Sequence, residues 1–267
     1  MSVIVYDPAR LGALAAQGIA DNPLFLFEND AGSFAVPGGT ASGGPVENLL
    51  TDATSKYCLP IGGVVTFSTS APITCAAINA HSFTGATVAV QYDAGGGTWT
   101  DCGAGSVTCT DNTAVMWRFP PNAATNWRLT ISGGPSQPAI ANLWAGVEMV
   151  MPQRFFRGYA PPIRPNVVET VTNISDGGHY LGSSLKRRGS APPPAPFDHV
   201  PDAFVRGAEF GRFMDHHAGG DPFFFAWRPQ TYDDVFFAWR AGDTIQPTNS
   251  TPGRRAFQIG MRYHHEP

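Results

Sequence analysis

Short apolar runs separated by turns dominate residues 60–150. Within these runs apolar and polar positions alternate, or apolar residues follow one another for several positions, which is typical of strands buried on one or both faces. Breaks rich in glycine and proline recur every ~8–12 residues, and this spacing predicts an antiparallel β-sandwich rather than a parallel α/β sheet. The strands are expected at 63–67, 73–78, 86–92, 114–119, 127–131 and 140–150.

The pattern changes at residue 151, where prolines at 152, 161, 162 and 165 predict an extended connector over 151–165. The connector separates a sandwich domain (40–150), preceded by an N-terminal arm (1–39), from a C-terminal domain (166–267). That domain contains strand candidates at 166–173 and 178–185. An imperfect apolar stripe over 201–216 predicts a helix that stops at Gly219 and Gly220. The fold class is therefore mainly β, with a sandwich followed by an α+β domain with one helix.

The sequence Phe-Phe-Ala-Trp-Arg occurs at 224–228 and again at 236–240, and the polar segment between the copies predicts an aromatic β-hairpin. Alternation places Phe224 and Ala226 on one face and Phe225 on the other. Two interpretations remain open: one face meets a neighbouring subunit, or both faces are core. The first makes interface candidates of Phe224, Trp227, Arg228, Phe236, Trp239 and Arg240. A closing strand is expected at 256–263, with alternate apolar residues on one face.

Composition narrows the class of protein. Only 14% of the 267 residues are charged, against roughly 25% in an average soluble domain, and glycine (30) and proline (24) are abundant. This excludes a coiled coil, and the 12% aromatic content excludes a disordered chain. The net charge of −4 argues against nucleic-acid binding. The start of the chain lacks the pattern of a secretory signal, and no apolar run suggests membrane insertion.

Four cysteines, Cys58, Cys75, Cys102 and Cys109, all precede residue 110, and none forms a CxxC pair. Buried free thiols are one interpretation, disulfides are a second, and an iron–sulfur cluster is a third. Seven histidines do not form an HExxH motif, and no P-loop, GxSxG elbow or marked pair of carboxylates occurs. We therefore expect no cofactor, no metal and no enzymatic activity.

Residues 43–57, with the segments 73–83, 88–92 and 97–100, resemble the galactose-binding-like (discoidin, factor 5/8 type C) jelly roll, and 148–150 resembles its last strand. The resemblance implies a jelly-roll sandwich over about 110 residues, although Cys58 stands where an aromatic is common. It also implies a glycan site on the loops at one end of the sandwich. The candidates are Asn48, Asp52, Lys56, Asn79 and His81, each of which has an ordinary structural role as its alternative.

The layout of 178–263 resembles the C-terminal part of tail-tip or baseplate proteins of long-tailed bacteriophages, of the distal-tail or minor-tail type. The matching pieces are 179–183, the helix to His216, the aromatic segment 221–229 and 257–261. The resemblance implies a structural subunit that forms a ring with copies of itself. Its other partners would be tail proteins (tube, hub, tape measure), and it would assemble in the host cytoplasm and reside in the virion tail tip. The alternative function is a carbohydrate-binding adhesion module that contacts a host surface glycan.

Overall fold

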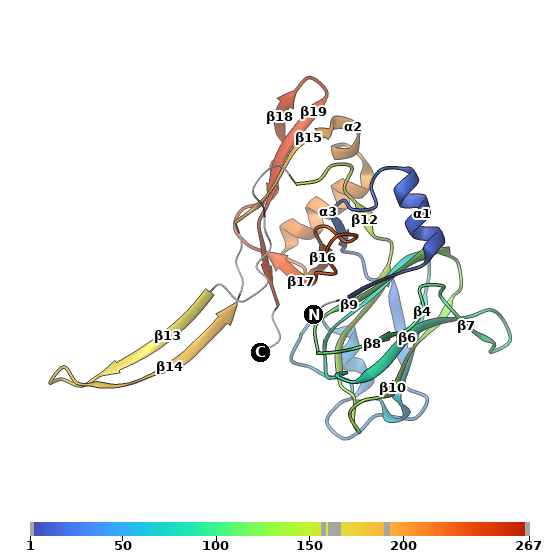
Figure 1. Ribbon diagram of the computed structural model, residues 1–267, viewed down its shortest axis with the longest axis horizontal. Helices are drawn as coiled ribbons and strands as arrows, with labels where there is room; N and C mark the ends of the chain where they lie inside the picture. Colours follow the sequence, from blue (N-terminus) through green and yellow to red (C-terminus); the bar gives the residue numbers. More distant parts are fainter. Residues whose placement is uncertain (1–2, 156–158, 160–166, 190–192, 265–267) are drawn as a thin grey trace. The chain divides into compact units, whose positions relative to one another are not determined.

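A computed structural model describes residues 3–155, 159, 167–189 and 193–264 (Figure 1). The chain divides into two compact units. The first contains the residues up to Arg154 and the segment Pro222–Phe237, and the second contains residues 155–221 and the chain from Ala238 onward. The predicted boundaries therefore differ from the observed ones. Most of the predicted connector, residues 156–158 and 160–165, lies outside the described residues.

The first unit is built on two sheets that face each other. The four-stranded sheet has the order β1-β9-β5-β11, with β1 (Val3–Tyr6), β5 (Ile73–His81), β9 (Val115–Asn122) and β11 (Ile140–Gly146). The other has the order β3-β4-β10-β6-β7, with β8 beside β6. Its strands are β3 (Ala31–Ala35), β4 (Val64–Thr69), β6 (Ala86–Asp93), β7 (Trp99–Asp101), β8 (Val107–Thr108) and β10 (Asn126–Gly133). The strands predicted at 63–67, 73–78, 86–92, 114–119 and 127–131 are confirmed, whereas the strand expected over 140–150 ends at Gly146.

Apolar side chains at alternate positions of the strands fill the space between the two sheets. Val88 and Val90 of β6 point inward, as do Trp127 and Leu129 of β10, and they join Trp117 and other residues of the opposite sheet in one apolar core. Trp127 stacks on Phe67 and Phe119, with ring centroids 6.4 Å and 5.4 Å away. The fold is therefore mainly β with an N-terminal antiparallel jelly-roll sandwich, as the sequence predicted.

The described part of the expected N-terminal arm, residues 3–39, is not separate from the sheets. β1 pairs in parallel with β9, and β3 pairs with β4. Between β1 and β2 (Leu24–Leu26) the chain forms helix α1 (Pro8–Ala16), which the sequence analysis did not predict. Asp7 caps this helix, since its side chain accepts hydrogen bonds from the backbone N–H groups of Ala9 and Arg10. Short 3₁₀ turns follow at Val46–Leu50 and Ile61–Gly63.

The aromatic hairpin forms as predicted, from β16 (Phe223–Ala226) and β17 (Val235–Arg240), but its first part belongs to the sandwich unit. β16 pairs with β2, which also pairs with β12 (Met149–Val150). Phe224 and Phe237 pack edge-on against Trp144 of β11, with centroids 5.7 Å and 5.9 Å away. On the opposite face Phe225 stacks on Phe25 at 5.1 Å. Where Phe224 and Phe225 lie, both faces of the hairpin are therefore core, whereas Trp227 and Trp239 are partly exposed.

The second unit combines two small sheets with two helices. β13 (Val167–Ile174) pairs with β14 (Tyr180–Gly189), and β19 (Arg254–Ile259) lies between β15 (Ala195–Pro201) and β18 (Thr248–Thr251). β20 (Met261–Tyr263) pairs with the last residues of β17. The helix expected over 201–216 is instead α2 (Asp202–Val205) and α3 (Ala208–Gly219). It breaks because Gly207 adopts an extended conformation, and α3 ends at the left-handed Gly220, where φ is 84°.

Candidate functional site

A groove of about 350 Å³ lies on the outer face of the six-stranded sheet, away from the sandwich core. Its lining comes from four segments of the sandwich unit. They are the residues just after β3, the 3₁₀ turn before β4 with the start of β4, the first residue of β7, and the middle of β10. The lining residues are Pro37, Gly38, Ile61, Gly62, Val64, Thr66, Trp99 and Arg128.

Strand alternation explains why Arg128 reaches this face. Its neighbours Trp127 and Leu129 point into the core, so Arg128 must point outward. The register of the sheet places Thr66 of β4 on one side of Arg128, and Gln91 of β6 on the other. The row of outward side chains across these three strands is therefore polar, and Arg128 lies at its centre.

Trp99 is positioned by the turn that joins β6 to β7. The carboxylate of Asp93 accepts hydrogen bonds from the backbone N–H groups of Gly95 and Gly97, at 2.9 Å and 3.1 Å from Oδ1. Both glycines have positive φ, 120° and 80°, which other residues rarely adopt. The turn therefore returns the chain to the sheet with Trp99 opposite Asp93.

Two contacts hold the guanidinium of Arg128 in place. Its centre lies 4.5 Å from the centroid of the Trp99 ring, and its Nε donates a hydrogen bond to Gln91 Oε1 at 2.7 Å. Neither the terminal Nη groups of Arg128 nor the indole N–H of Trp99 has a hydrogen-bond partner among the described residues. Beside them Ile61 is 52% exposed. The groove thus combines an apolar shelf, formed by Ile61 and Val64, with hydrogen-bond donors that have no partner among the described residues. This combination is typical of small-molecule sites.

None of the five predicted glycan-binding residues lines this groove. Asn48 donates to the backbone carbonyl of Tyr57 at 2.7 Å, and Asp52 and Lys56 are exposed in the following loop. Asn79 and His81 are buried at the end of β5. Their placement leaves Asn48, Asp52 and Lys56 as surface candidates, and gives Asn79 and His81 the structural roles that were their alternatives.

His81 is a buried, hydrogen-bonded side chain. Its Nε2 lies 2.8 Å from the carbonyl oxygen of Thr113, its Nδ1 accepts from the backbone N–H of Phe83, and its ring stacks on that of Phe83 at 4.6 Å. Burial lowers the pKa of His81 to about 4. The imidazole is therefore neutral at physiological pH.

The six predicted interface residues lie in different environments. Phe224 and Phe236 are buried, whereas the other four are partly exposed. Arg228 forms an ion pair with Asp21 at 3.0 Å, and Arg240 donates to the backbone carbonyl of Ala218 at 2.6 Å. Trp227 stacks on Tyr232, with centroids 5.0 Å apart. Trp227 and Trp239 thus remain candidate contact residues, while Phe224 and Phe236 are explained by the core.

All four cysteines are free and buried. Burial raises the pKa of Cys58 and Cys109 to about 11 and that of Cys102 to about 12, and it also raises that of Cys75. These shifts favour the protonated thiol over the thiolate in the folded chain. Within the described ranges, no group of three or more His, Cys, Asp or Glu side chains could hold a metal ion. Over the same residues, no helix has the length and apolar character needed to cross a bilayer.

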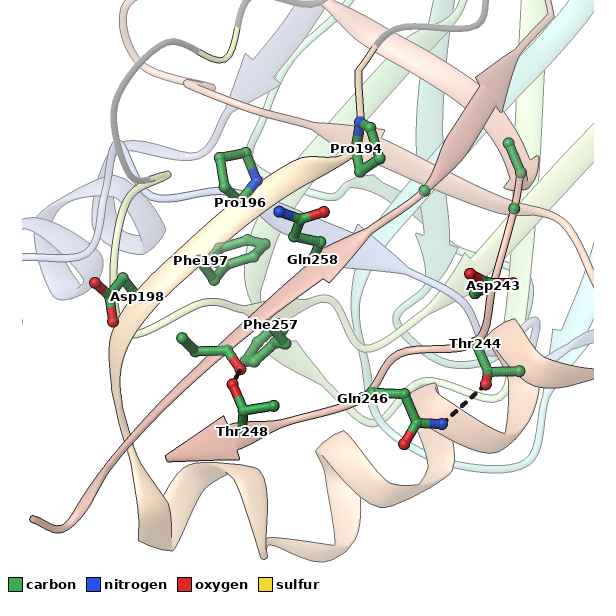
Figure 2. A pocket seen from close by; sticks show the side chains of 14 residues that line it. Pro194, Pro196, Phe197, Asp198, Asp243, Thr244, Gln246, Thr248, Phe257 and Gln258 are labelled. Atoms are coloured by element: carbon green, nitrogen blue, oxygen red, sulfur yellow. Dashed lines mark hydrogen bonds between the residues drawn. The ribbon is translucent and has the colours of Figure 1, made fainter. Parts of the chain in front are cut away.

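A larger pocket of about 620 Å³ lies in the second unit, over β15 and β19 and beside the loop that precedes β18 (Figure 2). Phe197 and Phe257 are buried beneath it, so its accessible lining is formed by two prolines, two alanines, glycine backbone and polar side chains. The polar lining residues are Asp198, Asp243, Thr244, Gln246, Thr248 and Gln258.

The polar groups of this pocket partly bond to one another. Gln246 donates to Thr244 Oγ1 at 3.1 Å, and Ser250 Oγ donates to the carboxylate of Asp198 (Figure 2 shows the first). The Ser250 hydrogen bond is also the main reason that the pKa of Asp198 is lowered. The pocket offers neither a cation nor an exposed aromatic ring. The groove on the sandwich offers a cation, Arg128, and a partly exposed aromatic ring, Trp99, and it is the stronger candidate for a binding site.

No family model matches the chain, and no curated protein matches it. Among solved structures, the CBM32-1 module of a family 31 glycoside hydrolase from Clostridium perfringens is 10% identical, covering 43% of this chain and 92% of that chain, with a TM-score of 0.36. Chitosan-binding module 1 of a chitosanase/glucanase from Paenibacillus sp. IK-5 is 13% identical, covering 45% and 97%, with a TM-score of 0.37. The CBM32-1 and CBM32-2 domains of Clostridium perfringens ZmpB, in complex with GalNAc, are 9% identical, covering 46% and 36%, with a TM-score of 0.38. These likenesses are too distant to carry an argument about function, and the sandwich fold stands on the strand pairing described above.

Proposed function

We propose that the sandwich unit binds carbohydrate, and that the groove around Trp99 and Arg128 is its binding surface. One observation carries the proposal. An indole of β7 and a guanidinium of β10 lie against each other across β6, next to an exposed apolar side chain, and their outer donors have no partner among the described residues. Such a surface has complementary groups for both parts of a sugar ring.

A pyranose presents C–H groups on its faces and hydroxyl groups around its edge. Ile61, Val64 and Pro37 provide apolar area against which a face can pack. Arg128 and the indole N–H of Trp99 can donate to the hydroxyl oxygens at the edge. Because these donors stand on strands of a sheet, little conformational entropy is lost when a ligand binds.

The experiment is isothermal titration calorimetry of the full chain against a panel of soluble polysaccharides and oligosaccharides, with Trp99→Ala as the diagnostic variant. We expect at least one glycan to bind, and the Trp99→Ala variant to bind it about 10-fold more weakly or worse, which corresponds to about 1.4 kcal/mol. Ser132→Ala is the matched control, because Ser132 is exposed on β10 two rows from the groove. A natively folded chain that binds no glycan, or unchanged binding by Trp99→Ala, would refute the proposal.

A second function, structural subunit of a bacteriophage tail tip, is favoured by a different observation. Among the described strands, β13 and β14 pair only with each other, and the tip of their hairpin exposes Ile174, Tyr180 and Leu181 by 64–67%. An isolated two-stranded sheet is marginally stable in water. Coverage of this hairpin by copies of the chain in a ring, or by other tail proteins, would stabilise it, and the protein would then reside in the virion tail tip.

Light scattering coupled to size-exclusion chromatography, together with negative-stain images, tests this second function. We expect ring-shaped oligomers, and we expect Leu181→Ser combined with Ile174→Ser to reduce them to monomers. The hairpin variant should keep glycan binding, since the groove lies in the other unit. A wild-type chain that stays monomeric, both alone and with tail proteins, would overturn the tail-subunit function and leave the glycan proposal standing.

A further inference from the structure

The charged side chains around the groove indicate which class of saccharide it binds. Residues 1–150 contain ten acidic and only four basic side chains, Arg10, Lys56, Arg118 and Arg128. Arg10 and Arg118 both form ion pairs with Glu148, at 2.6 Å and 3.2 Å. Lys56 does not line the groove, and neither does any acidic residue. Among the residues that the structure describes, Arg128 therefore has no carboxylate partner, although it lies in an otherwise acidic part of the chain.

The bonding of Arg128 leaves one side of its guanidinium available. Nε is engaged by Gln91, and the plane is held over the Trp99 ring, whereas the two Nη groups have no protein partner among the described residues. A guanidinium fixed in this way can form paired hydrogen bonds with a planar carboxylate. Charge-assisted hydrogen bonds of this kind are roughly twice as strong as neutral ones.

We infer that the groove selects an acidic saccharide, one whose sugar carries a carboxylate, and that Arg128 is the residue that binds this carboxylate. The inference rests on the proposed carbohydrate-binding function and gives that function a ligand class. The sugar ring packs on the apolar shelf of Ile61 and Val64, and its carboxylate reaches the Nη groups of Arg128.

The acidic surroundings do not cancel this preference at physiological salt. Screening reduces interactions between exposed charges over ~8–10 Å, so distant carboxylates of the unit repel a ligand only weakly. A carboxylate in contact with Arg128 keeps its attraction, because it lies well within that distance. Selectivity is therefore set at Arg128, and affinity should fall as salt is raised.

The test compares oligogalacturonate with its fully methyl-esterified form, which has the same sugar ring without the charge, by calorimetry on the full chain. We expect the acid to bind at least 10-fold more tightly than the ester. Arg128→Gln should bring the two affinities within about 3-fold. Arg128→Lys keeps the charge but loses the planar guanidinium that forms paired hydrogen bonds, so it should retain only part of the preference for the acid. Arg262→Gln, an exposed arginine of β20, is the matched control and should change neither affinity.

Two results would overturn the inference alone: equal affinity of the wild type for acid and ester, or a preference that survives in Arg128→Gln. A sulfated polysaccharide that competes more strongly than oligogalacturonate would also overturn it, because the site would then recognise sulfate. If neither form nor any member of the neutral panel binds, the proposed function itself fails. Circular dichroism and thermal unfolding of each variant show that the comparison is made on folded protein.

Discussion

Glu148→Gln is expected to destabilise the first unit severely, because Glu148 balances a buried positive charge. Its Oε1 accepts hydrogen bonds from Arg10 Nη2 at 2.6 Å, from Arg10 Nε at 3.1 Å and from Arg118 Nη2 at 3.2 Å, and Oε2 accepts from Thr74 Oγ1. The side chains of Arg118 and Glu148 are completely buried, whereas that of Arg10 is 16% exposed. The carboxylate thus ties helix α1 to strands β5 and β9.

The magnitude follows from burial. Glutamine has nearly the same shape but no charge, so the substitution leaves Arg118 in the core without a counter-ion. Removal of one partner from a buried ion pair costs about 3–5 kcal/mol, compared with about 0–1 kcal/mol for an exposed pair. Since native domains are stable by about 5–15 kcal/mol, this loss is a large fraction of the total.

Urea denaturation followed by tryptophan fluorescence measures the change in the free energy of unfolding. Glu47→Gln, at an exposed position of the 3₁₀ turn Val46–Leu50, is the control and should stay within about 0.5 kcal/mol of the wild type. The double variant Arg118→Met with Glu148→Leu should be less destabilised than Glu148→Gln alone, because it removes both charges together. A loss below about 1 kcal/mol for Glu148→Gln, or a double variant worse than the single one, would refute the reasoning.

Three further predictions concern stability and reactivity. Burial lowers the pKa of His81 from 6.5 to about 4, so between these pH values the unfolded chain binds a proton at His81 that the folded chain does not. The free energy of unfolding should therefore fall by about 3 kcal/mol as pH drops from 6.5 to 4. A His81→Asn variant that keeps this pH dependence would contradict the assignment. The four buried thiols should not react with a thiol-specific chromogenic reagent in the native chain, and all four should react in denaturant; fewer than four equivalents would reveal a bond or ligand. Gly260→Ala should cost about 1–3 kcal/mol in chemical denaturation, since a Cβ there would lie 1.9 Å from the carbonyl oxygen of Ala241, while Gly211→Ala in α3, where the space is open, should be neutral or stabilising.

The sandwich strands could be predicted because their information is local. In β6, the apolar residues Ala86, Val88 and Val90 occupy every second position and are buried in the core of the sandwich. The aromatic hairpin was found for a similar reason, since two copies of one aromatic segment flank a polar loop. Both the strand positions and the orientation of Phe224 follow from a period of two residues.

What the sequence analysis missed depends on partners far away in the chain. β1 has only four residues, of which one is fully buried, so its sequence carries a weak strand signal. It forms a strand by pairing with β9, more than a hundred residues later. Helix α1, in contrast, has a local signal, since Asp7 is an N-cap residue and Pro8 follows it at the first helical position. Glu148 lies inside what was expected to be one strand over 140–150. In the structure β11 ends at Gly146 and β12 begins at Met149, and Glu148, between them, forms an ion pair with Arg118.

In the candidate site, too, local sequence predicts some features, whereas others depend on residues far apart in the chain. Trp99 and Arg128 each occupy an outward position that alternation predicts correctly, but nothing local indicates that they meet. Their contact requires the order β10-β6-β7, which places strands from two parts of the sequence side by side. The glycan candidates, in contrast, came from a resemblance in sequence, and His81 shows that a matching residue can be buried.

The two proposed functions are best tested separately by point variants of the full chain, because the first unit is formed from two separate parts of the sequence. The chain leaves the first unit after Arg154 and returns to it for Pro222–Phe237, where Phe224 and Phe237 cover Trp144 on the outer face of the four-stranded sheet. A fragment limited to 40–150 would lack β1, β2, β3 and the hairpin, and would expose apolar surface that the full chain buries. Its failure to bind a glycan would then reflect lost folding rather than a lost site. Point variants on the intact chain avoid this ambiguity, since Arg128 and Leu181 lie in different units and can be changed one at a time without opening either core.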